Sequence, residues 1–278
     1  MDNMNAWSLS TQDTAVALEI KNGQPCIVFL GQPGGKNFAG RPACVRLPNR
    51  YTAEQTKITP RWEFVRAEKG ESDDGKYAEL YFRDPVGGLE TRSRWEAYNE
   101  PGAVTHQIRL DNKTGQSVII FQPESLDISL GTNAPTEVFF VHKDCAAARI
   151  ISRIRSGYGT YLEPLCDRYA MDVWTKPDDD DTGFVPLVML HAAKVYGIYI
   201  GGVWNHGRIA VRGVESGGMT AKIKAGLYDD FCAVINPGES FEVPMAFIGA
   251  YAGDIDDASN RLRKWLCGES YDRLKSKK

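Results

Sequence analysis

The segment Gly201–Arg208 collects the side chains of this sequence that are best suited to chemistry. Two glycines that allow a tight turn precede Trp204, Asn205 and His206, and Arg208 closes the segment after one more glycine. The indole ring offers a flat apolar face, and the polar groups offer hydrogen-bond donors and acceptors. This combination suits a sugar, which can stack on the ring and hydrogen-bond through its hydroxyls. The alternative is a hairpin tip that only packs its tryptophan.

Other motifs that could carry catalysis are absent or incomplete. The sequence contains no nucleophile elbow, no P-loop and no dinucleotide fingerprint, so no cofactor is predicted. The acidic run Asp178–Asp181 resembles the start of a calcium loop, but Met189 stands where that loop needs a bidentate glutamate. The 4 histidines have no metal-ligand spacing, and no metal site is predicted. His106 lies on an apolar strand face, so we expect a core histidine there.

Charge and composition exclude several classes of protein. The 278 residues include 33 Lys+Arg and 36 Asp+Glu, so the formal net charge is −3. This charge does not favour binding to nucleic acid or to an anionic membrane. No apolar run reaches the roughly 18 residues of a transmembrane helix. The N-terminus, Met1–Asn5, lacks the basic and apolar regions of a signal peptide. The 6 cysteines form no CxxC pair. We therefore expect reduced thiols in a cytoplasmic protein.

Alternation of apolar and polar residues predicts one strand after another along most of the chain. In Leu89–Tyr98 every second residue from Glu90 to Glu96 is charged, which is typical of a half-buried antiparallel strand. An Asn-Gly pair at 22–23 lies between two apolar runs and predicts a hairpin. Many further segments of this kind follow, punctuated by Gly, Pro and Asn. The pattern predicts two large stacked antiparallel sheets.

Only the C-terminal end has a helical period. Asp254 can cap a helix near 254–267, in which Ile255, Leu262 and Trp265 recur at helical spacing. Gly268 follows as a stop signal.

Several stretches in the C-terminal third resemble a known family. Ile235–Pro244 contains a Pro-Gly-Glu strand start, and Phe247–Asp254 ends in a Gly-x-x-x-Gly-Asp turn before the helix. Phe184–Leu187 and the later Trp204-x-x-Gly-Arg resemble the adjacent strand pair of the same family. Together they resemble the end of the N-terminal β-supersandwich domain of family 36 glycoside hydrolases, the α-galactosidase group.

The resemblance implies a fold and a division of the chain. The fold is an all-β, two-sheet antiparallel supersandwich, galactose mutarotase-like, over residues 1–253. A linker helix and tail, 254–278, lead toward a catalytic (β/α)8 barrel. The family's catalytic aspartates lie on barrel strands, so no catalytic residue can be carried over to this sequence. Where the family has a Ser-His-rich motif, this sequence has the acidic stretch 178–183.

The resemblance also implies a function and partners. We expect a non-catalytic domain that supports recognition of an α-galactoside-like carbohydrate and assembles with a catalytic barrel. Without a barrel, the helix 254–267 should instead join copies of the chain, because Trp265 and Leu266 extend beyond what its anchoring needs and would leave an exposed apolar stripe.

Two other functions stay open at this point. One is a stand-alone carbohydrate-binding module, which the sequence does not distinguish from a non-catalytic domain that assembles with a barrel. The other is a sugar-active enzyme on the mutarotase-like fold, which needs an acid and a base on either side of the anomeric carbon. His106, His206 and Glu239 are the residues that this sequence offers for those roles.

Overall fold

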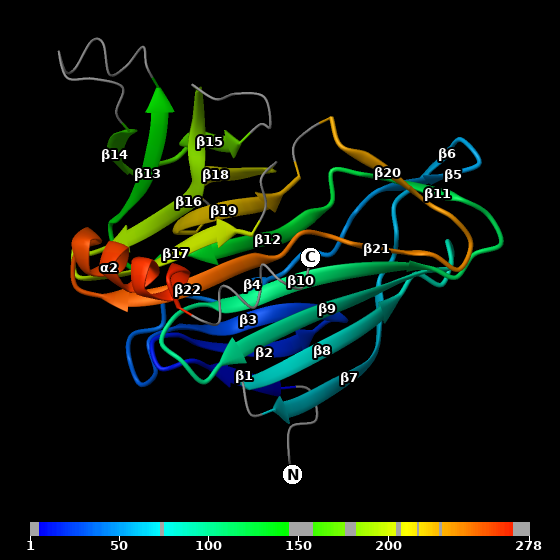
Figure 1. Cartoon of the computed structure of the whole chain (residues 1–278), viewed down its shortest axis with the longest axis horizontal. Helices are drawn as coiled ribbons and strands as arrows, with labels where there is room; N and C mark the ends of the chain where they lie inside the picture. The colour runs from blue at the N-terminus through cyan, green and yellow to red at the C-terminus, as the bar shows by residue number, and fades with distance from the viewer. Residues whose placement is uncertain are drawn as a thin grey trace.

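The computed structural model describes residues 6–72, 75–144, 158–175, 182–203, 207–215, 217–227 and 230–268. Strands account for 61% of the structure and pair into antiparallel sheets (Figure 1). The predicted all-β sandwich is therefore confirmed.

The largest sheet has ten strands and forms one wall of the molecule (Figure 1). In spatial order its strands are β14 (Tyr158–Pro164), β13 (Thr136–Asp144), β16 (Thr182–Ala192), β17 (Tyr196–Gly202), β22 (Ala246–Ala252), β10 (Val104–Asn112), β9 (Leu89–Tyr98), β8 (Gly75–Arg83) and β7 (Glu63–Ser72), and β21 (Ser240–Glu242) also pairs with β10. In β9 every second residue from Leu89 to Ala97 is buried, as the alternation predicts.

The second wall consists of two smaller sheets. One contains β1 (Ala6–Ser10), β2 (Ala15–Lys21), β3 (Gln24–Gly31) and β4 (Ala43–Cys44), and the other contains β12 (Glu124–Gly131), β19 (Met219–Gly226), β18 (Gly207–Glu215) and β15 (Ala170–Thr175). An isolated antiparallel bridge between Val45 and Ile128 connects them. The predicted hairpin between β2 and β3 is confirmed, because Asn22 and Gly23 both take positive φ, at 52° and 75°.

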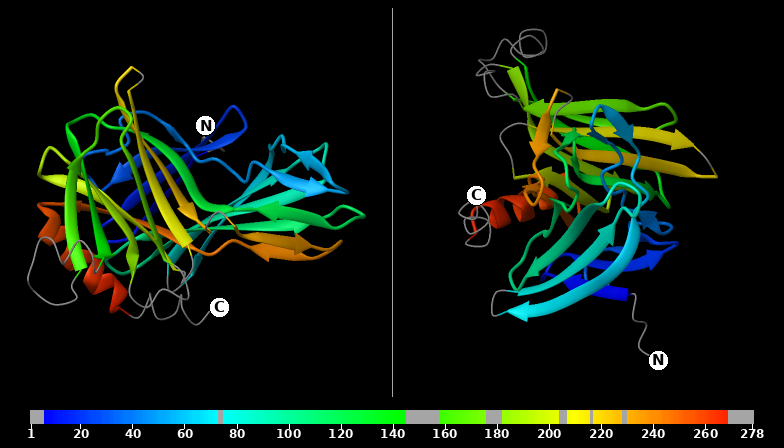
Figure 2. Two further views of the ribbon diagram at one scale, coloured as in Figure 1. Left: turned by 90° about the horizontal axis from the view of Figure 1, so that it is seen from above. Right: turned by 90° about the vertical axis from the view of Figure 1, so that its right-hand side faces the viewer.

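A further sheet extends beside the second wall. Its strands are β20 (Cys232–Ile235), β11 (Val118–Phe121), β5 (Tyr51–Ala53) and β6 (Thr56–Ile58). Tyr51, Val118 and Ile235 share a buried cluster with Leu80 of β8 and Ile108 of β10. This small sheet therefore packs on the β8–β10 end of the ten-stranded sheet, away from β13 and β14 (Figure 2).

The main core lies between the two walls. Ile200 of β17 and Ile248 of β22 share one buried cluster with Ile128 of β12, Ile209 of β18 and Ile223 of β19. Burying a side chain of this size stabilises the fold by about 1.5–3 kcal/mol. The inward side chains of β12, β18 and β19 are packed in this core. The backbone of these strands is therefore held in place, and it positions the side chains that point outward.

The single helix of the described residues is α2 (Ile255–Leu266), close to the predicted 254–267. Asp254 caps it by accepting hydrogen bonds from the backbone N–H groups of Asp256 and Asp257, and the Asp257 side chain accepts one from the backbone N–H of Asp254. This reciprocal capping box satisfies donors that have no partner within the helix. No helix in the described part of the chain is long and apolar enough to cross a membrane.

The expectation of an exposed apolar stripe on this helix is wrong. Trp265 is only 3% exposed, and its ring meets Phe247 of β22 edge-on with 4.7 Å between ring centroids. Ala258 and Leu262 are also buried, in one cluster with Tyr199 of β17. The outer face of the ten-stranded sheet is itself apolar here, and the helix covers it. The apolar residues of the helix therefore pack against the sheet of the same domain.

Candidate functional site

A charged cleft opens on the solvent-facing side of the second wall, next to the small sheet. It has a volume of about 540 Å³, within the range of about 300–1,000 Å³ typical of small-molecule sites. Glu124 and Asp127 of β12 line it together with Arg208 of β18 and Lys224 of β19. The remaining lining residues come from three other segments of the chain: Arg46, Leu47, Pro48, Asn49 and Arg50; Lys57 and Ile58 of β6 with Thr59; and Phe121 of β11 with Gln122 and Pro123.

The two carboxylates share the cleft because β12 contains a bulge. Glu124 pairs with Gly226, and Leu126 pairs with the next residue of β19, Ala225, so Ser125 is an extra residue in β12. An extra residue shifts the alternation of side chains by one position. Glu124 and Asp127 therefore point to the same side, although three positions separate them.

Gly226 leaves the space that Glu124 occupies. A Cβ atom at this position would lie 2.7 Å from the Cα atom of Glu124 and 2.8 Å from its Oε2 atom. Such distances are closer than real Cβ contacts, so a side chain at this position would require the backbone of β12 to shift. The absence of a side chain at Gly226 of β19 therefore makes room for Glu124 in the cleft.

A buried histidine supports the bulge from the core side. His106 of β10 donates from Nδ1 to the carbonyl oxygen of Ser125 at 2.6 Å, and its Nε2 accepts from Ser93 Oγ at 2.8 Å. Ser93 in turn accepts from the indole N–H of Trp95 at 3.1 Å. Burial lowers the pKa of His106 to about 3, so the ring is neutral. The predicted core histidine is confirmed, and it does not reach the cleft.

Cations surround both carboxylates of the cleft. Lys224 Nζ lies 3.7 Å from Glu124 Oε1 and 3.3 Å from Asp127 Oδ2. Arg208 Nη2 lies 3.9 Å from Glu124 Oε1, and Arg46 Nη1 lies 3.3 Å from Asp127 Oδ1. Lys224 and Arg46 are the more exposed members, whereas the two carboxylates are largely buried. The cleft floor is thus a compact array of alternating charge.

The pKa of the Glu124 carboxyl group is strongly perturbed. Burial raises its pKa to about 7, the charge of Asp127 adds to the rise, and Lys224 and Arg208 oppose it. Its Oε2 atom is buried and has no hydrogen-bond partner among the described residues. A carboxyl group with this pKa can donate or accept a hydrogen bond near neutral pH. Beside the guanidinium of Arg208 it can bind a hydroxyl, which is both donor and acceptor.

Of the residues predicted from the Gly201–Arg208 segment, Arg208 is the one whose position the structure describes. It lines the cleft and is 22% exposed at its side chain. Trp204, Asn205 and His206 lie outside the described residues, as does the acidic run Asp178–Asp181. Glu239, considered as a catalytic acid or base, instead accepts hydrogen bonds from the backbone and side-chain nitrogens of Asn236 at 3.0 and 2.9 Å. It therefore serves the turn between β20 and β21.

Sequence reasoning missed Glu124, Asp127 and Lys224. These residues come from β12 and β19, which are remote in sequence, and no motif surrounds them. The bulge at Ser125, which brings the carboxylates together, has no recognisable sequence signal either. Within the described ranges no group of three His, Cys, Asp or Glu side chains could hold a metal ion.

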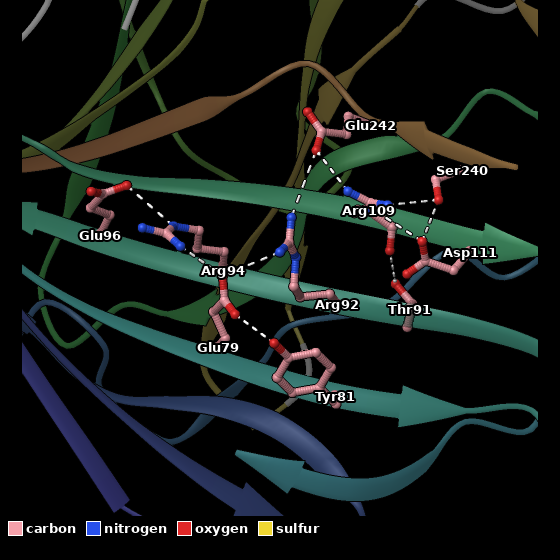
Figure 3. A network of polar contacts seen from close by, with 10 residues as sticks. All are labelled: Glu79, Tyr81, Thr91, Arg92, Arg94, Glu96, Arg109, Asp111, Ser240 and Glu242. Carbon is pink, nitrogen blue, oxygen red and sulfur yellow. Dashed lines mark hydrogen bonds and ion pairs between the residues drawn. The ribbon is translucent and has the colours of Figure 1, made fainter. Parts of the chain in front are cut away.

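A second polar cluster lies on the outer face of the ten-stranded sheet (Figure 3). Its members on this face are Glu79, Tyr81, Arg92, Arg94, Glu96, Arg109, Asp111, Ser240 and Glu242, and the inward-facing Thr91 joins it through a hydrogen bond to the backbone carbonyl of Arg109. At its centre Glu79 accepts hydrogen bonds from Arg94 Nη1 at 2.7 Å and Tyr81 Oη at 2.6 Å. Burial would raise the pKa of Glu79, but these two hydrogen bonds and the nearby arginines overcome it and lower the pKa. This carboxylate is satisfied within the protein, so the cluster acts as cross-strand support for the sheet.

Comparisons with known proteins agree with this architecture. No protein-family model and no curated protein matches the sequence. Among solved structures, an α-galactosidase from Lactobacillus brevis superposes with a TM-score of 0.76 at 13% identity, over 96% of this chain and 42% of that one. A variant GH36 α-galactosidase from Geobacillus stearothermophilus, in complex with stachyose, gives 0.72 at 15% identity, over 92% and 42%. A galactose mutarotase related enzyme from Lactobacillus acidophilus gives 0.55 at 11% identity, over 90% and 98%.

The fold is therefore an all-β sandwich of the galactose mutarotase-like type. More specifically, it matches the N-terminal domain of GH36 α-galactosidases. The chain spans 42% of the length of the two α-galactosidases that it matches here.

Proposed function

We propose that this chain is a carbohydrate-binding sandwich domain that acts together with a catalytic (β/α)8 barrel and is not itself a catalyst. In this proposal residues 1–253 form the binding domain, and residues 254–278 connect it to the barrel. The observation that carries the proposal is the charged cleft, where Glu124 and Arg208 offer adjacent acceptor and donor groups on a rigid wall.

The ligand that we propose is an α-galactoside-like sugar. Polar side chains with paired donor and acceptor groups dominate the cleft floor, and hydroxyl groups on neighbouring carbons can bridge such pairs. The rim adds an apolar surface, since Phe121 lines the cleft with the Arg50 guanidinium 5.7 Å from its ring centroid. Stachyose is the sugar present in one of the matched α-galactosidase structures, so it is a reasonable first probe.

Calorimetric titration of the full chain with stachyose tests the binding. We expect saturable binding that weakens about tenfold or more in Glu124→Gln and in Arg208→Gln, because each change leaves a sugar hydroxyl without its partner. Arg212→Gln is the matched control. Arg212 lies on the same face of β18 but pairs with Asp172 at 2.6 Å and does not line the cleft. Equal affinity in all three variants would contradict the proposal, as would no binding by the wild type.

The absence of catalysis by the isolated chain is tested in parallel. The chain should release no galactose from stachyose under conditions in which it binds the sugar. Hydrolysis that persists through repurification and disappears in Glu124→Gln would overturn the non-catalytic assignment.

A second candidate is a sugar-active enzyme of the mutarotase type, and the ionisation of Glu124 favours it. A carboxyl group whose pKa is about 7 is suited to general acid–base catalysis at neutral pH. The mutarotase related enzyme is matched over 98% of its length, so an enzyme of that kind needs no additional barrel. Exchange between the α and β anomers of galactose, measured by NMR, separates the candidates. Acceleration by the wild type that is lost in Glu124→Gln would favour the enzyme.

A further inference from the structure

Two cysteines face each other on neighbouring strands of the second wall. Cys26 of β3 pairs with Cys44 of β4, and the backbone N–H of Val45 donates to the carbonyl of Pro25 at 2.8 Å. This hydrogen bond places the two cysteines opposite each other at a non-hydrogen-bonded position of the ladder, where side chains come closest. Their Sγ atoms lie 3.1 Å apart, and a disulfide bond requires about 2.05 Å.

We propose that Cys26 and Cys44 form a reversible disulfide that locks the segment Ala43–Arg50 in place beside the charged cleft. This inference concerns the chain itself and does not depend on the identity of any ligand of the cleft.

The ladder that joins this segment to β3 is short. β4 has only 2 residues, and it pairs with β3 only through Cys26 with Cys44 and Ile27 with Ala43. Immediately after it, the backbone N–H of Arg46 donates to the carbonyl of Asp127 at 2.8 Å, and the following residues to Arg50 line the cleft. A covalent bond at Cys44 would therefore tie β3 directly to the segment that forms one wall of the cleft.

The two thiols differ in a way that suits stepwise oxidation. Cys44 is exposed, whereas Cys26 is 1% exposed. With a low-molecular-weight disulfide such as oxidised glutathione, the Cys44 thiolate attacks one sulfur, breaks the S–S bond and releases one glutathione thiol. Cys26 then loses its proton and attacks Cys44 Sγ of the mixed disulfide, which releases the second glutathione thiol. Both protein thiol protons thus leave with the two glutathiones.

Burial affects the second of these steps. It raises the pKa of Cys26 to about 12, with further contributions from Cys44, so Cys26 is the poorer nucleophile of the pair and reacts second. This makes Cys44 the attacking thiol and Cys26 the resolving thiol. A reductant reverses the reaction through the exposed Cys44 sulfur.

The proposal is tested on the full chain incubated with oxidised glutathione and then with dithiothreitol. Peptide mapping by mass spectrometry without reduction should show a Cys26–Cys44 linked peptide that dithiothreitol removes. The oxidised protein should melt about 5 °C higher, since a cross-link of this span restricts the unfolded chain. Amide exchange at Val45 and Arg46 should slow at least severalfold, because both N–H groups flank the new bond.

Two variants separate this pair from the other thiols. Cys44→Ser changes an exposed side chain, so it should fold, and it should lose the linked peptide, the rise in Tm and the slower exchange. Cys232→Ser, an exposed cysteine of β20, should keep all three effects. The proposal is overturned if the wild type forms no Cys26–Cys44 peptide, if Cys44→Ser shows the same rise in Tm, or if the disulfide forms without slowing exchange at Val45 and Arg46.

Discussion

The Nδ1 atom of His106 donates a hydrogen bond of 2.6 Å to the carbonyl oxygen of Ser125, and this contact joins the sandwich core to the charged cleft. Ser125 is the extra residue of the bulge in β12, and an extra residue leaves backbone groups without a partner in the ladder. A buried carbonyl without a partner is costly. His106 supplies that partner from the core, and the bulge then turns Glu124 toward Asp127.

The first prediction concerns the pH dependence that His106 imposes. Its pKa falls from 6.5 to about 3 on folding, so the unfolded chain binds a proton in this range that the folded chain does not. The stabilising contribution of neutral His106 is complete above pH 6.5 and is lost progressively as the pH falls toward 3. Urea denaturation should show a slope approaching 1.4 kcal/mol per pH unit from this group. His106→Gln should remove that slope, and an unchanged slope would show that other groups carry it.

The second prediction concerns Glu124, whose pKa shifts in the opposite direction. It rises from 4.5 to about 7 on folding, so the folded chain holds a proton that the unfolded chain releases. Stability from this group is complete below pH 4.5 and is lost as the pH rises through 7, by up to about 3 kcal/mol. Glu124→Gln should be relatively more stable than the wild type at pH 8 than at pH 4. Glu68→Gln, at an exposed carboxyl of β7, should show no such difference.

The effects of His106 and Glu124 overlap between pH 4.5 and 6.5 and partly cancel there. The single variants separate them. Carbon-13 NMR of the Glu124 carboxyl group provides a direct check, and a midpoint below pH 5 would contradict the effect of burial.

The third prediction concerns Gly226, opposite the bulge. A Cβ atom there would meet Glu124 and, at 2.8 Å, the carbonyl oxygen of Pro123. Gly226→Ala should therefore cost about 1–3 kcal/mol of unfolding free energy, as overpacking usually does. Gly115→Ala is the control, because a Cβ at Gly115 meets nothing within 4 Å and its φ is not positive. A neutral Gly226→Ala would mean that β12 can move away from β19.

The fourth prediction concerns the packing of α2. Trp265 is 3% exposed and contacts Phe247, so Trp265→Ala should destabilise the domain by about 3–5 kcal/mol in urea denaturation. Lys264→Ala changes the exposed face of the same helix and should stay within about 0.5 kcal/mol of the wild type. Equal, small effects of both variants would mean that the helix contributes little to the fold.

The strands and the helix could be predicted from the sequence because their signals are local. The alternation in Leu89–Tyr98 records which face is buried, whatever strand lies next to it. The Asn-Gly turn at 22–23 and the cap at Asp254 depend on backbone conformations that a few neighbouring residues determine. The burial of His106 could also be predicted, because the residues that alternate with it along the strand are apolar.

The cleft could not be predicted, because it depends on pairings between strands far apart in the chain. Glu124 and Lys224 meet only when β12 pairs with β19, and Arg208 joins them only because β18 lies on the other side of β19. The bulge at Ser125 then decides that Glu124 faces the cleft. The same holds for Trp265: its helical spacing was visible, but whether solvent, another protein or the ten-stranded sheet covers it depends on the tertiary fold. Periodicity is a property of one segment, whereas burial and ionisation are properties of the neighbours that folding brings to it.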